Sequence, residues 1–458
     1  MLSNKSLSMD RLVSNPEGWV SAAIFSHPDV YEQELEQVFA RMWLFVGHEC
    51  QIPRPGDFVR SRMGEEQVIV TRGKDNKVYV LLNSCPHRGN MVCRYDEGHG
   101  LAFQCSFHGW TFGSDGRLIN LPPGTEEEYA SDLNKAEWGM LQARVEIFHG
   151  TIWANWDPKA PSFVDYLGDC APYLTAALSD AEGDPDGTEI VGNVMRWRVG
   201  MNWKVPMPDH DLTHGWITHR SMRGLAPVAI EDTTREDRFD NDFHIWFPEG
   251  HTTSITLPSQ QQRESDEAAV PSRPGGDIVQ QYIRAKAAKR RERLGVMARV
   301  RELPHIFPNV GAVGSIFRIM HPQGPDSSEM WSYVIVDKNA PDEVKEAIVV
   351  ARERISGPNG IQQKDDMENW FIQTRYSKGT MTRWSLRQNN QLGMSRPSID
   401  GPSNFGLPGY FHAAPTDENY RRFFEHYKAV MEANDWDELL AAEKSKSVAG
   451  MKAGVTAR

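Results

Sequence analysis

The sequence predicts an α+β protein of two domains, because the chain is long and its pattern changes along its length. At 458 residues, the chain exceeds what a single hydrophobic core usually holds. Residues 44–157 contain short apolar runs between turn residues and no long helical pattern, which indicates a small all-β domain. Residues 158–458 mix strands with amphipathic segments, which indicates a larger domain of antiparallel sheet and helices. Residues 1–43 are expected to form an N-terminal helical segment that packs on the larger domain.

Composition and charge argue against several classes of protein, namely nucleic-acid-binding, membrane-spanning and secreted proteins. Hydrophobic residues make up 40% and charged residues 24%, with a net charge of −12 and a pI near 5.7. An acidic chain is not typical of a nucleic-acid-binding protein, and we interpret the basic run at 284–293 as the solvated face of a helix. No apolar run reaches the length of a membrane span, and the N-terminus lacks the apolar core of a signal peptide. Five cysteines, of which two are assigned below, favour a reducing compartment. We therefore expect a cytoplasmic protein with neither membrane nor nucleic acid as a partner.

Local patterns predict the elements of the first 157 residues. A helix should begin at Pro28 with Asp29 as its cap, because apolar residues recur on one face as far as Met42. The residues 114–116, Ser-Asp-Gly, are a strong signal for a hairpin turn. Strands are predicted at 43–47, 58–61, 67–71, 78–82, 111–112, 117–119, 145–148 and 151–155.

The larger domain combines strands and helices with polar connections. A surface loop is predicted at 259–275, which is polar and rich in proline and glycine. Strands are predicted at 190–199, 243–247, 252–256, 315–319 and 331–336, and helices at 277–302, 342–355, 365–374 and 416–443.

Two short segments each pair a cysteine with a histidine. Cys85 and His87 lie in Cys-Pro-His-Arg-Gly, and Cys105 and His108 lie in Cys-Ser-Phe-His-Gly-Trp. Seventeen residues separate His87 from Cys105. Two thiolates suit one iron of a [2Fe–2S] cluster, and two neutral imidazoles suit the other. Proline and glycine beside these residues are typical of tight turns, whose N–H groups can point at sulfur. A structural zinc site is the alternative, although zinc fingers more often group like ligands together, whereas each loop here mixes the two types.

Both loops resemble the ligand loops of Rieske proteins. The resemblance implies that Cys85, His87, Cys105 and His108 hold a Rieske [2Fe–2S] cluster and that residues 44–157 form the Rieske domain.

A second candidate metal site follows in the larger domain. His214 and His219 are five residues apart, which places them about 140° apart around a regular helix of 3.6 residues per turn. They can bind one metal only if the helix is distorted or broken, as in a π-type turn, and Gly215 makes such a break easier. Two histidines at this spacing are, taken alone, more often unrelated.

The surrounding residues resemble the large (α) subunits of Rieske ring-hydroxylating oxygenases. The matching pattern is Asn-Trp-Lys at 202–204, followed by Asp211, His214 and His219 in Asp-x-x-His-x-x-x-x-His. The resemblance implies that both histidines bind a mononuclear Fe(II) and that Asp366 is the third ligand, with Asp365 the less favoured choice. Such a facial triad leaves positions open for O₂. The alternative for the Asp-Asp pair is an acidic helix N-terminus, which accounts for one aspartate without excluding the other as a ligand.

The same resemblance implies a helix-grip-like catalytic domain and a larger assembly. Asp211 would accept hydrogen bonds from His108 of a neighbouring subunit and from His214, which a carboxylate suits. That bridge implies a trimer of α chains, and the length resembles α subunits that join small β subunits as α₃β₃. Electrons would come from NADH through a separate reductase or ferredoxin, because the chain has no dinucleotide-binding fingerprint. The implied reaction is the conversion of an aromatic ring to a cis-dihydrodiol.

The chain departs from the family pattern near the expected substrate. A Glu-Asn pair that commonly follows Asn-Trp-Lys is absent, Thr213 stands where tyrosine is common, and Ser356 stands where some members carry phenylalanine. We hypothesise an open, mostly apolar pocket for a bulky or polycyclic aromatic. Three alternatives stay open: a Rieske monooxygenase or demethylase, an aromatic-acid dioxygenase, and a non-enzymatic Rieske electron carrier, which would need no facial triad. Candidates for the substrate pocket are Met207, Pro208, Leu212, Ser356 and Gln362.

Overall fold

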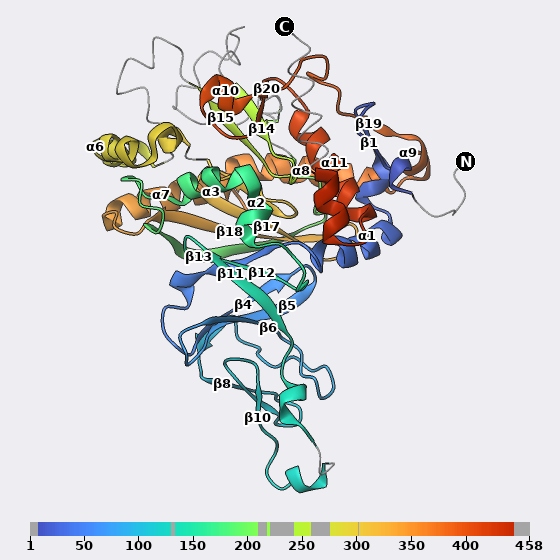
Figure 1. Ribbon diagram of the computed structural model, residues 1–458, viewed down its shortest axis with the longest axis vertical. Coiled ribbons are helices and arrows are strands. Elements are labelled where there is room, and N and C mark those ends of the chain that lie inside the picture. The colour runs from blue at the N-terminus through green and yellow to red at the C-terminus, as the bar shows by residue number, and fades with distance from the viewer. Residues whose placement is uncertain are drawn as a thin grey trace. The chain divides into compact units, whose positions relative to one another are not determined.

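The computed structural model describes residues 8–129, 133–208, 218–219, 242–257, 275–300 and 302–443 (Figure 1). The chain forms two compact units. The smaller unit is Val38–Phe163, and the larger unit combines Met1–Gln37 with Val164–Arg458. The smaller unit is six residues wider at each end than the predicted range 44–157.

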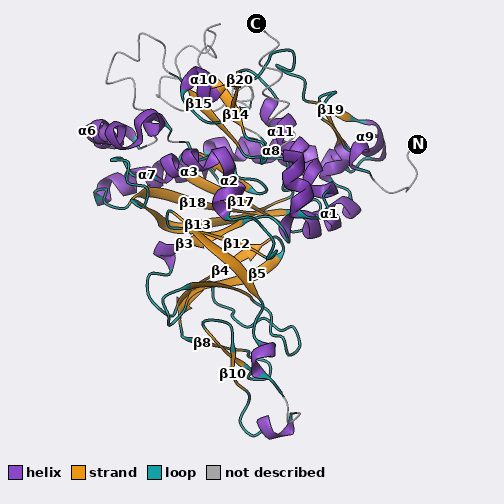
Figure 2. Ribbon diagram, viewed as in Figure 1, coloured by secondary structure: helices purple, strands orange, loops and turns teal. Residues whose placement is uncertain are grey.

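The smaller unit is built mainly from antiparallel strands and short 3₁₀ turns, and the π-helix Leu35–Phe39 ends at its start (Figure 2). Its seven-stranded sheet has the order β3-β12-β11-β6-β5-β4-β7, and a three-stranded sheet has the order β10-β9-β8. The strands are β3 (Leu44–His48), β4 (Asp57–Met63), β5 (Glu66–Arg72), β6 (Val78–Leu82), β7 (Glu97–His99), β8 (Ala102–Gln104), β9 (Thr111–Gly113), β10 (Leu118–Asn120), β11 (Gln142–Phe148) and β12 (Thr151–Asn155).

One hydrophobic core of this unit surrounds the two cysteine–histidine loops. Ile69 and Leu81 from the large sheet pack with Phe112 from the small sheet, and all three are fully buried. Cys85 and Cys105 belong to the same core, at 2% exposure each. Residues of both sheets therefore pack around the two cysteines, which excludes water from their sulfur atoms.

The described residues of the larger unit form three antiparallel sheets, ordered β13-β18-β17-β16, β15-β14-β21-β20 and β1-β2-β19. Its strands are β1 (Val13–Ser14), β2 (Trp19–Ser21), β13 (Thr188–Val199), β14 (Asp242–Trp246), β15 (Thr252–Thr256), β16 (Val310–Val313), β17 (Ile316–Pro322), β18 (Ser328–Asp337), β19 (Arg387–Asn389), β20 (Ile399–Asp400) and β21 (Tyr410–Ala413). The α-helices are α1 (Pro28–Glu34), α3 (Ala171–Leu178), α6 (Gly276–Leu294), α7 (Asp342–Ser356), α8 (Ile361–Ser377), α9 (Thr380–Ser385), α10 (Gly401–Phe405) and α11 (Glu418–Glu432), and α2 (Phe163–Leu167) begins at the division between the units.

Helices α6 and α7 cover one face of the sheet that contains β17 and β18. Ile316 lies opposite Val334 in the strand ladder, and both pack with apolar residues of α6 and α7. Two residues further along, Arg318 lies opposite Ser332 on the same face, because side chains alternate along a strand. This face of the sheet thus changes from apolar to polar along its length.

The mixture of an all-β unit with a unit of antiparallel sheets and helices confirms the predicted α+β class. No described helix is long and apolar enough to cross a membrane.

Several local predictions were wrong. The side chain that caps α1 belongs to His27, whose Nδ1 accepts from the N–H of Asp29 at 3.2 Å. Helix α8 begins at Ile361, so the Asp-Asp pair lies in its second turn rather than at its N-terminus. The basic run of α6 is not wholly solvated, because Arg290 is buried at 1% exposure.

Candidate metal centres

The two cysteine–histidine loops have the same backbone geometry. The N–H of Gly89 donates to the carbonyl of Cys85 at 2.8 Å, and the N–H of Gly109 donates to the carbonyl of Cys105 at 2.9 Å. The φ angles of the two glycines are +71° and +72°, a left-handed conformation that glycine adopts most easily. A Cβ atom at Gly89 would meet nothing within 4 Å, so the backbone angle rather than crowding favours glycine there.

The two loops bring their cysteine side chains together and their histidine side chains together. The thiol of Cys85 is hydrogen-bonded to that of Cys105. The rings of His87 and His108 lie 4.7 Å apart between centroids. His108 Nδ1 is buried and has no hydrogen-bond partner in the described part of the chain, which suits an atom that binds metal. A thiol pair beside an imidazole pair fits a two-iron cluster, in which each iron takes one pair.

Within the described residues, no group of three or more histidine, cysteine, aspartate or glutamate side chains is arranged to hold a single metal ion. A structural zinc site would instead need four ligands around one centre.

Backbone N–H groups in the loops point at the sulfur atoms. Burial raises the pKa of Cys85, and the N–H of His87 offsets only part of that effect. Burial also raises the pKa of Cys105, but the N–H of Phe107 and the side chain of Asn90 outweigh it, so the pKa is lowered. Asn90 Nδ2 lies 3.6 Å from Cys105 Sγ. Such donors stabilise negative charge on sulfur, as a bound thiolate requires.

Neighbouring groups favour the neutral form of the first imidazole, His87, and orient its ring. Burial lowers the pKa of His87, and the nearby His108 and Arg88 lower it further. The ring of Trp110 stacks on that of His87, with centroids 5.0 Å apart and planes 8° apart. Trp110 Nε1 in turn donates to Tyr129 at 3.2 Å. The supporting roles of Asn90 and Tyr129 were not predicted, because neither residue belongs to the cysteine–histidine motifs.

The second candidate centre brings together two residues far apart in sequence. His219 Nε2 lies 3.2 Å from an oxygen of Asp366, and His219 Nδ1 lies 3.7 Å from an oxygen of Asp365. Burial lowers the pKa of His219, but these two carboxylates outweigh it and raise the pKa overall. The candidates Asp211, Leu212 and His214 lie outside the described residues.

Arg318 and Gln363 lie near Asp366, although the sequence did not single them out. Asp366 is 8% exposed and shares the buried face of α8 with Gln363, one turn before it. Burial lowers the pKa of Arg318 to about 10, against an opposing effect of Asp366, and Arg352 lowers it further. A charged residue inside the apolar run of β17 was the available signal for Arg318.

The described pocket candidates are buried to different extents. Met207 and Ser356 are each 1% exposed, Pro208 is buried, and Gln362 is half-buried. His305 Nδ1 lies 2.5 Å from the carbonyl oxygen of Met207, which fixes the backbone there.

Two residues of the Asn-Trp-Lys motif bind the buried carboxylate of Glu34 in the larger unit. Lys204 Nζ lies 2.5 Å from an oxygen of Glu34, and Trp203 Nε1 donates to the other oxygen at 2.8 Å. Tyr427 of α11 also donates to Glu34. The motif is thus a structural anchor for α1 and α11.

Comparisons with known proteins find a Rieske domain in this chain and relatives that match nearly its whole length. Residues 42–136 match the family model of the Rieske [2Fe-2S] domain. The chain is 33% identical to the biphenyl dioxygenase subunit alpha of Metapseudomonas furukawaii, over 93% of each chain. It is 33% identical to a benzene 1,2-dioxygenase subunit alpha of Pseudomonas putida, over 94% of this chain and 95% of that one.

A solved structure of naphthalene 1,2-dioxygenase with indole bound in the active site superposes with a TM-score of 0.85. It is 27% identical and covers 98% of this chain and 99% of its own. Because the similarity to the curated relatives extends over nearly the whole chain, both units take part in it. The chain therefore belongs to the family of Rieske aromatic ring-hydroxylating dioxygenases, as a large (alpha) oxygenase subunit.

Proposed function

We propose that this terminal oxygenase adds both atoms of O₂ to a bulky or polycyclic aromatic ring, giving a cis-dihydrodiol. The contact between His219 and Asp366, at 3.2 Å, carries the proposal. It brings a histidine and a carboxylate together in a buried site, as a two-histidine, one-carboxylate iron centre requires.

We assign Cys85, His87, Cys105 and His108 to the [2Fe–2S] cluster, and His214, His219 and Asp366 to a mononuclear Fe(II). When bound, the cluster supplies electrons and the iron activates O₂. The chain's own groups prepare these sites. Loop N–H groups stabilise the thiolates, Trp110 orients His87, and Asp365 lies beside the second nitrogen of His219.

The chain is one component of a multicomponent dioxygenase, which needs a reductase or ferredoxin and usually a beta subunit. We infer an α₃β₃ assembly, in which Asp211 accepts hydrogen bonds from His214 and from His108 of a second copy. The mass of the purified complex, with and without a co-expressed beta subunit, tests this stoichiometry.

The names of the relatives support the aromatic substrate. The curated relatives are named for biphenyl, benzene and naphthalene. The last of these is the large oxygenase component of a naphthalene 1,2-dioxygenase system from Pseudomonas fluorescens. Ser356, which replaces a larger family side chain, leaves more room for a bulky ring.

The test compares the wild type with His214→Ala and His219→Ala, supplied with a reductase, biphenyl, naphthalene and isotopically labelled O₂. We expect the wild type to place two labelled oxygen atoms in each product. Both variants should keep the visible spectrum of the cluster and lose the product. Product formation by either variant would contradict the iron assignment, and a single labelled atom would identify a monooxygenase.

A further inference from the structure

Several buried polar side chains of the larger unit have atoms without a hydrogen-bond partner among the residues described, and three of them lie on neighbouring elements. Gln363 and Ser356 are each 1% exposed, and Arg318 is 6% exposed. The unpartnered atoms are both amide atoms of Gln363, Oγ of Ser356 and Nε of Arg318. Buried polar groups in folded proteins are nearly always hydrogen-bonded, so a group of three such side chains calls for a ligand or a structural reason.

All three side chains belong to elements that meet near Asp366. Gln363 lies one turn before Asp366 on the buried face of α8. Arg318, on β17, is close enough to Asp366 for the carboxylate to oppose the lowering of the Arg318 pKa by burial. Ser356 is the last residue of α7, and Gly360 immediately precedes α8. The two residues lie close together, because a Cβ atom added to Gly360 would be only 2.8 Å from the backbone nitrogen of Ser356. The N-terminal turn of α8 therefore packs against the end of α7.

The polar character of this layer is local. Along α7, the buried side chains follow one stripe, Val344, Ile348, Arg352 and Ser356. Val344 and Ile348, at the start of this stripe, pack in the apolar core with residues of α6, whereas Arg352 and Ser356, at its end, are polar. The facing sheet changes in the same way, from Ile316 and Val334 to Arg318 and Ser332.

The charge of the layer favours an oxygen acceptor. Arg318 and Arg352 bring two guanidinium groups close enough to interact, and Asp366 is the carboxylate that acts on Arg318. If Asp366 binds iron, as proposed above, its charge is shared with the metal. N–H donors of Arg318 and Gln363 are then left in a buried place where an acceptor would be well bound.

We propose that Gln363, Ser356 and Arg318 form a polar subsite that binds an oxygen-bearing substituent of the aromatic substrate, such as a hydroxyl, carbonyl or carboxylate. The inference rests on the proposed function and refines it. The preferred substrate is an oxygenated aromatic, and the plain hydrocarbon of the same shape is a poorer one.

The experiment uses naphthalene, 1-naphthol and 1-naphthoate with the complete enzyme. The wild type should show a higher kcat/KM with one or both oxygenated compounds than with naphthalene. Gln363→Leu, which keeps the size of the side chain, should reduce that preference about tenfold or more, because the substituent loses its partner. The matched control is Gln373→Leu, the same change at a half-buried glutamine further along α8 and outside the candidate pocket, which should leave the preference unchanged.

A thermal measurement without turnover separates substrate binding from a structural role. Without substrate, Gln363→Leu should unfold at the same or a higher temperature, because it removes an unsatisfied amide. The oxygenated compound should raise the unfolding temperature of the wild type and of Gln373→Leu, but not of Gln363→Leu. Ser356→Ala, which removes only a hydroxyl, should lose part of the preference and serves if the leucine variant does not fold. Gln363→Glu should reject 1-naphthoate more strongly than 1-naphthol, because it adds a negative charge.

Two results with the variants would overturn the subsite. One is an unchanged preference in both Gln363→Leu and Ser356→Ala. The other is an equal loss with all three compounds together with a lower unfolding temperature, which would show a structural role. Turnover of naphthalene at the same rate as its oxygenated analogues by the wild type would refute the subsite but leave the proposed function intact. No turnover of any of the three, with the cluster spectrum present, would refute the proposed function as well.

Discussion

The carboxylate of Glu34 joins three segments that are far apart in sequence. It accepts from Lys204 and Trp203 in the Asn-Trp-Lys motif and from Tyr427 of α11. Glu34 and Lys204 are both fully buried. Burial lowers the pKa of Lys204, while the charge of Glu34 opposes that effect. Both oxygens of Glu34 accept hydrogen bonds, so burying this ion pair costs less free energy than burying a single unpaired charge.

Lys204→Met should destabilise the protein by about 3–5 kcal/mol, because it leaves the Glu34 carboxylate buried without its cation. Denaturant unfolding of the two proteins measures the difference. The control is Lys345→Met, which removes a cation 2.7 Å from Glu189 in a partly exposed pair. That change should cost about 1 kcal/mol or less. Equal costs for the two variants would contradict the importance of burial.

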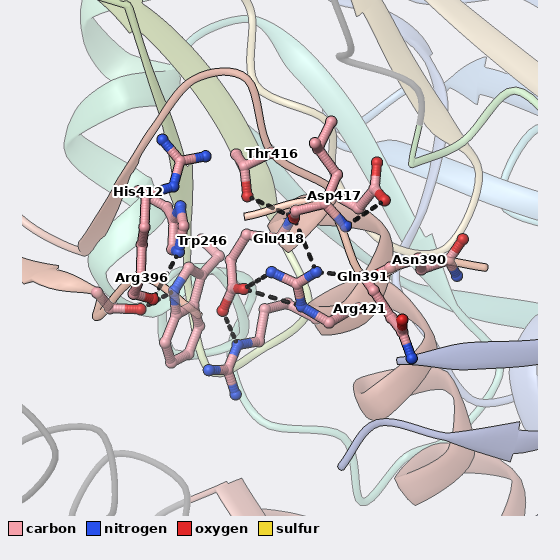
Figure 3. Close-up of polar contacts among 12 residues, drawn as sticks. Trp246, Asn390, Gln391, Arg396, His412, Thr416, Asp417, Glu418 and Arg421 are labelled. Atoms are coloured by element: carbon pink, nitrogen blue, oxygen red, sulfur yellow. Dashed lines mark hydrogen bonds and ion pairs between the residues drawn. The ribbon is translucent and has the colours of Figure 1, made fainter. Parts of the chain in front are cut away.

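At the scale of single elements, helix α11 is held by a cluster around its first residue (Figure 3). Glu418 accepts from Arg421 Nε at 3.0 Å and from Arg422 Nε at 2.7 Å. Arg421 also donates to the carbonyls of Asn390 and Leu392, at 2.5 and 3.1 Å. The guanidinium carbon of Arg422 lies 4.0 Å from the ring centroid of Trp246 on β14. The cluster therefore ties α11 to one sheet and to the segment at 390–392.

Glu418→Gln should make the protein's stability less sensitive to acid. Burial raises the pKa of Glu418, but Arg422 and Arg421 outweigh it, so the folded pKa lies below the ordinary value of 4.5. A lowered carboxyl pKa adds stability that is complete above pH 4.5 and is lost as pH falls through the folded pKa. The variant should be less stable by about 2 kcal/mol at pH 7, and the gap should shrink below pH 4.5. A gap that stays constant down to pH 3, in unfolding curves measured at each pH, would contradict this.

Arg290 joins the end of α3 to the segment that follows α6. Its guanidinium donates five hydrogen bonds to backbone carbonyls, those of Ala176, Ser179, Asp180, Ala298 and Val300. Carbonyls at a helix end lack partners within the helix, and the five donors of arginine satisfy several at once.

Arg290→Lys should therefore destabilise the protein by about 2–4 kcal/mol, because one ammonium cannot reach five carbonyls in different directions. Chemical denaturation at neutral pH measures the loss. Arg293→Lys, at an exposed position of the same helix, keeps the charge and should change the stability by less than about 0.5 kcal/mol. A neutral result for Arg290→Lys would mean that the carbonyls find other partners.

The sequence predicts elements well where the signal is local. β6 has the predicted range 78–82, and α7 begins at the predicted residue, because alternation and helical periodicity are local patterns. Strand β19 was missed because it is short and pairs with β2, more than 360 residues earlier in the chain. The burial of Arg290 was missed for the same kind of reason, since carbonyls from two segments far apart in sequence create its site.

The candidate sites show the same contrast between residues that a local pattern predicts and residues that only the tertiary structure brings together. The cysteine–histidine loops are local, so their ligands could be read from the residues themselves. The pairing of His219 with Asp366 depends on tertiary structure, and only the family resemblance indicated it. Gln363 and Arg318 gave little sequence signal, because their environment is made by neighbouring elements. The neighbouring Gln362 was named instead, since position alone does not show which side of α8 is buried.

At the scale of the molecule, the smaller unit is a continuous stretch of chain, whereas the larger unit is made of two stretches. The first strand of the smaller unit, β3, pairs with its last strand, β12, so the chain enters and leaves at neighbouring strands. The four cluster residues and the core around them all lie within this stretch. Such a unit resembles an independently folding domain.

We therefore expect residues 38–163, expressed alone with iron and sulfide, to fold and bind a Rieske cluster. The reason is that every proposed ligand, the turns that hold them and the stacked Trp110 are present in this segment. Visible absorption and electron paramagnetic resonance should match those of the full chain. The same segment with Cys105→Ser should stay folded, by circular dichroism, and lack the cluster spectrum. A soluble, folded but colourless segment, next to a coloured full chain, would show that the larger unit contributes to the cluster site.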